Sequence, residues 1–425
     1  MEEKTLIEDK EAQLQGESVD VSRSILGKSA FAAFKYSDFR LLLPGALLSN
    51  IGTWIQWSAL LWLVRDMTRS ETWVGVVNMA NFLPVLFFVL YTGSLADRLN
   101  RKILILSSQA IMMVSALFLG IFSSLGFLSL ALIITFTTIN GIAFVFNFPA
   151  WRSIVSDLVP GDDLLNGVAW DSASFNMARF LGPAIGAFIV NKMGFSWAFY
   201  VNAMSFLAVL GALALTKTKT PGYKLQSGTR RHIFEGIKFV TKNVWARNVL
   251  ILLAISSFFG VPYIVLLPGL AKDVLHSEVL GFGFLLGATG LGAVIAAPLV
   301  SVLGRTFTEK RILKLVTSIF ALALLAFSFS RNFALSTFIS GILGACYLSI
   351  SATINSLLQS RVERNFRGRI MSFYILVFQG VFPLGGITFG FLADLTSIPI
   401  ALLFCGCTIT ALALVILVFP ILDGI

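Results

Sequence analysis

The chain is poor in the residues that build metal centres, disulfide frameworks and charged surfaces. Of its 425 residues only 13% are charged, two are histidines and three are cysteines. Cys346, Cys405 and Cys407 lie within apolar stretches, where they indicate packing rather than disulfides or thiolate metal ligands. The two histidines are far apart, and no GxxxxGK[ST] run offers a P-loop for a nucleotide. We therefore predict no metal, no cofactor and no enzymatic activity.

Long apolar runs take the place of charge. Hydrophobic residues make up 56% of the chain and its mean hydropathy is +0.85, which is too apolar for a soluble globule and indicates a protein of the lipid bilayer. A run of about 20 apolar residues crosses the hydrocarbon core as a helix. Twelve such runs predict an all-α membrane protein with spans at Leu41–Val64, Trp73–Tyr91, Ile103–Phe122, Leu128–Phe148, Val168–Val190, Trp197–Leu215, Val249–Leu270, Gly281–Leu303, Ile312–Phe329, Phe333–Leu358, Ile370–Leu392 and Ile400–Phe419.

The runs divide into two groups of six. A polar interval at 217–247 separates them, and its segment HIFEGIKFVTKN predicts an amphipathic helix at the cytoplasmic membrane surface. Pro183 and Gly186 of span 5 recur in span 11 as Pro383 and Gly386, which indicates that the two groups are related. We predict a disordered cytoplasmic tail at 1–29, six-helix bundles at 30–216 and 248–425, and a cytoplasmic linker between the bundles.

The positive charge is placed by topology. Most of the 32 lysines and arginines fall in the N-terminal segment and in the links after even-numbered spans. Because basic links stay on the cytoplasmic side, both termini are predicted to be cytoplasmic. The net charge of +10 then reflects topology and attraction to anionic lipid, so no nucleic-acid partner is expected.

One charged link carries a recognisable pattern. The stretch GSLADRLNRK, residues 93–102, joins spans 2 and 3 as a tight turn, in which Gly93 and Asn100 are expected at positive φ. It resembles the signature between helices 2 and 3 of the major facilitator superfamily, with Asn100 in place of the second glycine. The resemblance implies twelve helices in two pseudo-symmetric bundles and transport by alternating access. The residues that match are Gly93, Leu95, Asp97, Arg98, Arg101 and Lys102.

The same resemblance implies a gate at the cytoplasmic side. Asp97 would interact with the start of helix 11 and with Arg152 at the end of helix 4. Gly368 and Arg369, with Arg367, would form the start of helix 11. A carboxylate at a helix N-terminus is favoured by about 0.3–1 kcal/mol. This is enough to bias two conformers of similar energy.

Span 5 carries two charges within apolar sequence. Arg179 falls near mid-membrane, where a guanidinium costs at least ~2.5–3.5 kcal/mol, so it is expected to face a cavity or a partner. It would bind an anionic group of a substrate or, alternatively, join neighbouring helices without touching substrate. Asp171 lies about 12 Å along the same helix, too far to pair with Arg179. It is the candidate proton-coupling residue or, alternatively, an exposed carboxylate of the first turn.

Small residues in spans 5 and 8 predict a close helix contact. The sequence GPAIGA, 182–187, resembles the helix 5 motif of exporters in this superfamily, and close packing without a bias in transport direction is the alternative. Gly182 and Gly186, flanking Pro183, form a smooth face. The matching face on span 8 has Gly283 and Gly287, so helices 5 and 8 are expected to pack across the two halves.

In the superfamily, helices 1, 4, 7 and 10 line the central cavity. Each of these spans here carries polar and aromatic residues at helical spacing, which suit an amphiphilic organic substrate or, alternatively, hold helices together. The predicted cavity residues besides Arg179 are Asn50, Trp54, Trp57, Asn140, Asn147, Tyr263, Tyr347, Ser351 and Asn355.

The loops RSIVSDLVPGDDLL and RVERNFRGRIMSF and the run GTWIQWSALLWLV resemble one branch of the superfamily, the drug and siderophore exporters. This resemblance implies a monomeric secondary transporter of a bacterial cytoplasmic membrane, surrounded by lipid. It would export an amphiphilic small molecule in exchange for protons. A lysophospholipid transporter of the same fold is the alternative, and a sensor that does not transport is a further one.

Overall fold

The computed structural model describes residues 30–96, 100–217 and 239–419, and these are almost entirely helical. Twelve helices are long and apolar enough to cross a membrane, so the predicted number of spans is confirmed. The N-terminal half contains the short η1 (Ala32–Lys35) and η2 (Gly161–Asp163) and six spans: α2 (Ser37–Thr68), α3 (Glu71–Ala96), α4 (Arg101–Ser124), α5 (Leu130–Leu158), α6 (Leu164–Met193) and α7 (Phe195–Leu215).

The C-terminal half contains two interrupted spans. The seventh is built from α9 (Val244–Ile255), η3 (Ser256–Gly260), α10 (Tyr263–Gly269) and η4 (Leu270–Val274). The eleventh is built from α14 (Arg364–Ile375), η5 (Leu376–Gly380) and α15 (Val381–Leu395). The segments η3, η4 and η5 are π-helical. The other spans are α11 (Val279–Leu303), α12 (Glu309–Phe329), α13 (Phe333–Arg361) and α16 (Ile398–Val418).

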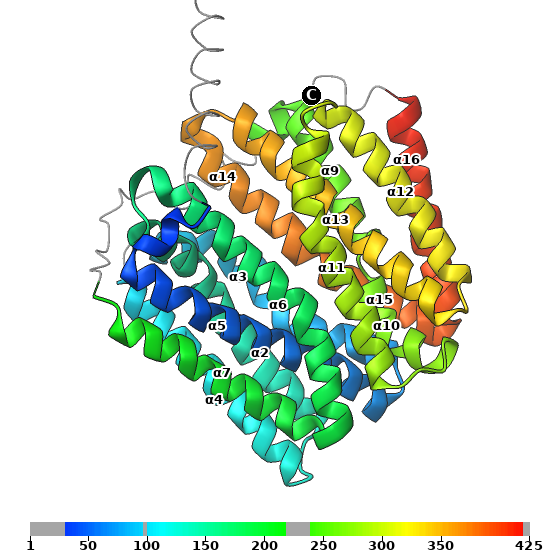
Figure 1. Ribbon diagram of the computed structural model, residues 1–425. Helices are drawn as coiled ribbons and strands as arrows, with labels where there is room; N and C mark the ends of the chain where they lie inside the picture. Colours follow the sequence, from blue (N-terminus) through cyan, green and yellow to red (C-terminus); the bar gives the residue numbers. More distant parts are fainter. Residues whose placement is uncertain (1–29, 97–99, 218–238, 420–425) are drawn as a thin grey trace, which may run out of the picture.

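The halves lie beside each other, with the helices coloured blue to green on the left of Figure 1 and those coloured yellow-green to red on the right. The two most extensive contacts between them are α3 with α15 and α6 with α11. The predicted packing of helix 5 against helix 8 is the second of these pairs. Glycines permit both crossings. A methyl group at Gly75 would lie 2.8 Å from the carbonyl oxygen of Gly386, and one at Gly290 would lie 2.5 Å from that of Arg179.

The turn between α3 and α4 differs from its prediction. Gly93 lies inside α3, so it has a helical backbone instead of a positive φ. Asn100 has φ −64°, and its side chain accepts hydrogen bonds from the amides of Lys102 (3.0 Å) and Ile103 (3.3 Å). Asparagine is favoured here because it caps the N-terminus of α4. Asp97 and Arg98 lie outside the described residues.

The segment before α2 is tied to the start of α6. The hydroxyl of Tyr36 donates to Asp163 over 3.1 Å, and the amide of Ala33 donates to Asn166 over 3.0 Å. Lys35 also pairs with Asp163, and this hydrogen bond raises the pKa of Lys35 above its ordinary value. These contacts fix the first turn of the helix that carries Asp171 and Arg179. The predicted tail at 1–29 and most of the predicted linker helix lie outside the described residues.

Within the C-terminal half, α11 and α13 cross closely enough to predict a stability effect. A methyl group at Gly344 would lie 2.0 Å from the carbonyl oxygen of Thr289, so Gly344→Ala forces the helices apart. Overpacking of this kind costs about 1–3 kcal/mol. We expect a lower melting temperature for the purified protein. Gly211→Ala, where a methyl group has open space, is the matched control, and an equal melting temperature for both variants would contradict the crossing.

Candidate functional site

Arg179 lies where the two halves cross. It is on α6, and its backbone carbonyl packs against Gly290 of α11. Its guanidinium carbon lies 5.5 Å from the centroid of the Trp54 ring on α2, which is a cation–π contact. Tyr263 and Tyr347 of the C-terminal half are within electrostatic range. The cation therefore contacts one aromatic ring of its own half and lies within electrostatic range of two tyrosines of the other half.

The N-terminal half contributes an aromatic group around Trp54. The Trp54 and Trp57 rings meet edge to face at 5.1 Å, and Phe175 lies 6.2 Å from Trp54 on its other side. The indole nitrogen of Trp57 donates to Asn78 over 3.3 Å, which fixes the ring against α3. Asn50 is one turn before Trp54 and is partly buried.

The C-terminal half contributes three stacked rings. Tyr347 and Phe378 stack at 5.5 Å with an interplanar angle of 9°, and Phe378 and Tyr374 stack at 5.8 Å and 7°. The Tyr347 hydroxyl donates to the carbonyl of Phe378 over 3.3 Å and lies 3.0 Å from the Ser257 hydroxyl. It thus bridges η3 and η5, and π-helical turns of this kind are frequent at functional sites.

Other predicted cavity residues are held within one half. Tyr263 is 1% exposed and packs on Phe327. The Ser351 hydroxyl lies 2.6 Å from that of Tyr374. Asn355 accepts from Gln359, and Asn140 donates to Asn81 of α3 over 3.1 Å. Asn147 is buried. Tyr263, Ser351 and Asn140 thus join neighbouring helices, whereas Asn355 bonds within α13. Arg179 contacts Trp54 and lies within electrostatic range of Tyr347, near the boundary between the halves.

Asp171 and Arg152 are neighbours. The indole nitrogen of Trp151 donates to one oxygen of Asp171 over 2.9 Å, and Arg152 lies 3.6 Å from the other. Asp171 is only 6% exposed, so it is not an exposed first-turn carboxylate. Arg152 was expected beside Asp97, which the structure does not describe. Its partner among the described residues is a carboxylate of its own half.

Two other predicted gate residues, Arg101 and Lys102, also bind within the N-terminal half. Arg101 donates to both oxygens of Asp157 at 2.8 Å, and Lys102 donates to the carbonyl of Thr216 over 2.8 Å. At the start of the eleventh span, a methyl group on Gly368 would meet no atom within 4 Å. The side chain of Arg369 is not described.

The predicted glycine faces do not meet each other. A methyl group at Gly182 would lie 2.4 Å from Cβ of Trp54, and one at Gly186 would lie 3.1 Å from Cα of Ile55, so both glycines admit α2. Gly283 and Gly287 do face α6, but against Ala187 with the carbonyl of Pro183, and against the carbonyl of Phe180, respectively. The reason is geometric, since Gly182 and Gly186 lie on the side of α6 that faces α2, whereas α11 packs on another side of α6.

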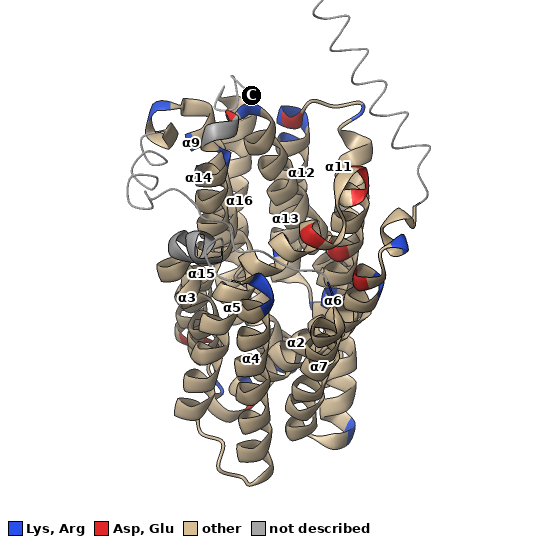
Figure 2. Cartoon of the chain, turned by 90° about the vertical axis from the view of Figure 1, so that its left-hand side faces the viewer, with Lys and Arg blue, Asp and Glu red and all other residues tan. Residues whose placement is uncertain are grey.

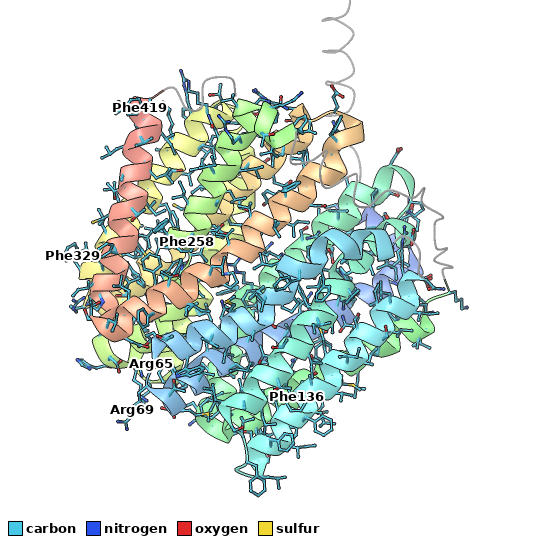
Figure 3. The ribbon with its side chains drawn as sticks, turned by 180° about the vertical axis from the view of Figure 1, so that it is seen from behind. Arg65, Arg69, Phe136, Phe258, Phe329 and Phe419 are labelled. Atoms are coloured by element: carbon cyan, nitrogen blue, oxygen red, sulfur yellow. The ribbon has the colours of Figure 1, made fainter. Side chains whose placement is uncertain are left out.

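The sequence reading missed a group of charges at one end of the molecule, here named the end cluster: Arg65, Asp66, Glu71, Lys272, Asp273 and Asp394. Arg65 of α2 bonds Glu71 over 2.6 Å and also bonds Asp273 of η4. Lys272 bonds Asp66 over 2.5 Å. Figure 3 shows Arg65 where the two halves meet. The sequence does contain a signal for this cluster, because these charged residues lie at the ends of apolar runs.

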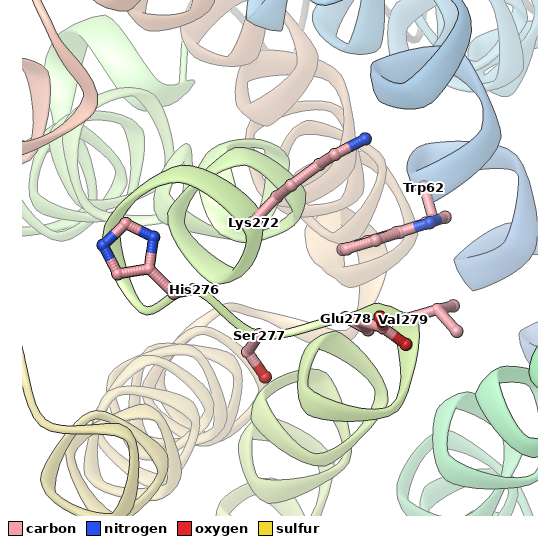
Figure 4. Close-up of a pocket in the computed structure, with 6 residues that line it drawn as sticks. All are labelled: Trp62, Lys272, His276, Ser277, Glu278 and Val279. Atoms are coloured by element: carbon pink, nitrogen blue, oxygen red, sulfur yellow. The ribbon is translucent and has the colours of Figure 1, made fainter.

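A cavity of about 460 Å³ lies beside the end cluster. Figure 4 shows Lys272 and Trp62 near each other at this cavity, with Nζ of Lys272 5.9 Å from the Trp62 ring. Its other lining residues are His276, Ser277, Glu278 and Val279. Lys272 is bonded to Asp66, so this cation of the lining is already paired.

The bridge made by Tyr347 gives a stability prediction. Tyr347→Phe keeps the stacked ring but removes the bonds to Ser257 and to the Phe378 carbonyl. The loss of a buried hydrogen bond typically costs about 0.5–1.5 kcal/mol. We expect a lower melting temperature, measured on purified protein. Tyr200→Phe, which removes a 2.9 Å contact to Ser124 at an exposed site, should have a smaller effect. The reverse order would contradict a buried bridge.

Comparison with known proteins gives consistent matches over the chain. A family model described as transmembrane secretion effector matches residues 28–424. The staphyloferrin A transporter of Staphylococcus aureus is 24% identical over 83% of this chain and 89% of its own length. The multidrug efflux pump Tap of Mycolicibacterium fortuitum is 23% identical over 89% and 95%. The macrolide efflux protein A of Streptococcus pyogenes is 22% identical over 90% and 96%.

Solved transporter structures share the fold. The nucleoside transporter NupG, as its D323A mutant, superposes with a TM-score of 0.72 at 15% identity, covering 89% of this chain and 99% of that one. A bacterial homologue of the human lysosomal transporter Spinster, inward-facing and unoccupied, superposes with a TM-score of 0.67 at 14% identity. That match covers 90% of this chain and 95% of the other.

Proposed function

Because the chain belongs to the major facilitator superfamily of membrane transporters, in the family of transmembrane secretion effectors, we propose that it exports an amphiphilic small molecule by alternating access. The cargo would be drug-like or siderophore-like, and protons would move in exchange. The observation that carries this proposal is the aromatic group around Arg179, since residues of both halves form it. A site at the boundary between halves can face either side of the membrane as the halves rock.

The relatives support export as the direction of transport and a drug-like or siderophore-like molecule as the cargo. Two of them are efflux proteins by name, and a third transports staphyloferrin A. The site itself supports an organic substrate, because tryptophan, tyrosine and phenylalanine rings surround a few polar groups. Arg179 supports a cargo with an anionic group, since its side chain has an aromatic neighbour but no carboxylate within 4 Å among the described residues.

We place the end cluster on the outer side of the membrane. Figure 2 shows more lysines and arginines near the ends of α9, α12 and α14 than on the helices below them. By the positive-inside rule that end, and both termini, would be cytoplasmic. The Spinster homologue, which is inward-facing, shares the fold of this chain.

The role of Arg179 is tested by changing its charge. Arg179→Gln should reduce export of anionic amphiphiles by at least about tenfold, the equivalent of ~1.4 kcal/mol, and should affect cationic ones less. Arg179→Lys should retain part of the activity, because the charge remains without the planar group. Accumulation is measured in a strain without its own pumps, with Lys192→Gln as an exposed control on the same helix.

Equal losses for anionic and cationic compounds would contradict the anion site. The same panel includes drugs, siderophores and, in proteoliposomes, labelled lysophospholipid. Movement of the lipid without export of the soluble compounds would favour the lysophospholipid transporter.

Proton coupling is tested at Asp171. Asp171→Asn keeps the size of the side chain and its contact with Trp151 but removes the exchangeable charge. If Asp171 carries the proton, we expect the variant to lose export driven by the proton gradient while it still equilibrates substrate. Accumulation is measured before and after the gradient is collapsed. Asp163→Asn, at another buried carboxylate of this half, is the control, and wild-type coupling in Asp171→Asn would remove the role.

A further inference from the structure

Ion pairs join the two halves at one end. Among the described residues, the pairs that cross between the halves are Arg65 with Asp273 and Lys272 with Asp66, both in the end cluster. The other pairs lie within the N-terminal half. The two crossing pairs have partly exposed members, and exposed pairs hold little energy alone. What sets this end apart is therefore the two carboxylates beside them, Asp394 and Glu71.

Asp394 caps a helix of the opposite half. It lies on the last turn of α15, and one of its oxygens accepts from the amide of Glu71 over 2.7 Å. The other accepts from the amide of Thr72 over 3.0 Å and from its hydroxyl over 2.6 Å, and the Ser70 hydroxyl donates to it as well. The first amides of a helix have no partner within the helix and carry partial positive charge. A carboxylate of the C-terminal half thus supplies the acceptors for the start of α3.

Glu71 reaches in the opposite direction, from α3 into the C-terminal half. Its side chain is 2% exposed and fills the space over Gly269 of α10. A methyl group at position 269 would lie 1.7 Å from its Oε1 and 2.6 Å from Cδ1 of Ile398. Arg65 donates to Oε1 over 2.6 Å, while Oε2 is buried and has no partner among the described residues. Glycine at 269 is therefore what lets the carboxylate enter the other half.

We propose that Asp394 and Glu71 are positioning residues of the transport cycle, which together hold this end of the molecule closed until they separate from α3 and from Gly269. This inference rests on the proposed alternating-access function. Asp394 is bonded to the opposite half, whereas Glu71 is bonded to Arg65 of its own half and packs over Gly269 of the opposite one. Both contacts between the halves break in any motion that parts α3 from α15 and α10. Neither residue touches the aromatic group around Arg179.

The chemistry of the contacts suits a reversible closure. When the end opens, water can solvate the first amides of α3 and the carboxylate of Glu71, so the polar groups exchange one set of partners for another. The unpartnered Oε2 gains hydrogen bonds on opening, which opposes the attraction between Arg65 and Asp273 across the halves. Two arrangements with nearly balanced contacts are what a two-state gate requires.

The experiment measures the opening of this end directly. Cysteines replace Met67 of α2 and Thr396, just beyond α15, in a full-length protein whose three native cysteines are changed to serine. Both positions are exposed and lie on opposite halves beside the end cluster. Spin labels on the two cysteines give a distance distribution for the purified protein in lipid nanodiscs, with a short population expected for the closed end.

The variants separate the two contacts. Asp394→Ala and Gly269→Ala should each increase the long-distance population relative to the short one by about tenfold or more, as loss of a contact made in one state only does. Asp394→Asn, which keeps acceptor oxygen without charge, should fall between Asp394→Ala and the parent. Gly269→Ala should have a much smaller effect in a Glu71→Ala background, because the carboxylate is gone and the methyl group then meets only Cδ1 of Ile398, a flexible side chain of the same half.

Two controls match the changes. Gly211→Ala adds a methyl group in open space, and Glu309→Ala removes an exposed acid from the first turn of α12, so neither should move the distances. Size-exclusion profile and melting temperature show that each variant is folded. Comparing Glu71→Ala with the double variant Glu71→Ala/Gly269→Ala provides a second measurement, because it shows the effect of the added methyl group when the carboxylate is absent.

Unchanged distances in folded Asp394→Ala and Gly269→Ala would overturn the proposal, and so would a shift from Gly269→Ala in the Glu71→Ala background as large as the one in the parent protein. Transport is measured separately in the parent protein. Absence of export with the predicted distance shifts would contradict the proposed cargo function and leave the closure supported. Export with unchanged distances would overturn the closure alone.

Discussion

A helix that starts at a membrane surface must find acceptors for its first amide groups, and in this protein α3 finds them in the other half. Asp394 of α15 accepts from two of these amides and from two hydroxyls beside them. In lipid and at its surface an unsatisfied backbone group is costly, so the cap and the contact between halves are the same set of bonds. The ion pairs of the end cluster lie beside this cap on α3.

The apolar part of the boundary depends on glycine. Gly75 and Gly390 let α3 and α15 touch backbone to backbone, and Gly283 and Gly290 do the same for α11 on α6. Close approach maximises dispersion contacts where lipid removes the hydrophobic driving force. The α6–α11 crossing also places Arg179 near residues of both halves, so the packing that joins the halves also positions this half-buried cation.

The sequence predicted which helices form and which two helices pack across the halves better than it predicted which side chains meet. Span number and the helix 5 to helix 8 contact follow from local composition, and both are present in the structure. The pairing of Gly182 with Gly283 was wrong, because Gly182 faces Trp54 of α2. Gly93 and Asn100 do not take positive φ, since α3 runs through the first and the second caps α4. The cavity roles of all the predicted residues, Arg179 included, stay predictions.

The sequence by itself determined how many times the chain crosses the membrane and the family, because apolar runs and the GSLADRLNRK turn are properties of short, contiguous stretches. The bounds of the helices did not follow, since α5 runs to Leu158 and not to the predicted Phe148, and spans 7 and 11 are interrupted by π-helical segments. The tertiary structure alone decided the partners of the charges: Arg152 with Asp171, Arg65 with Asp273, and Asp394 with the start of α3. The last pair is separated by more than 300 residues. Such contacts depend on the angle at which two whole bundles meet, and no local pattern in the chain encodes that angle.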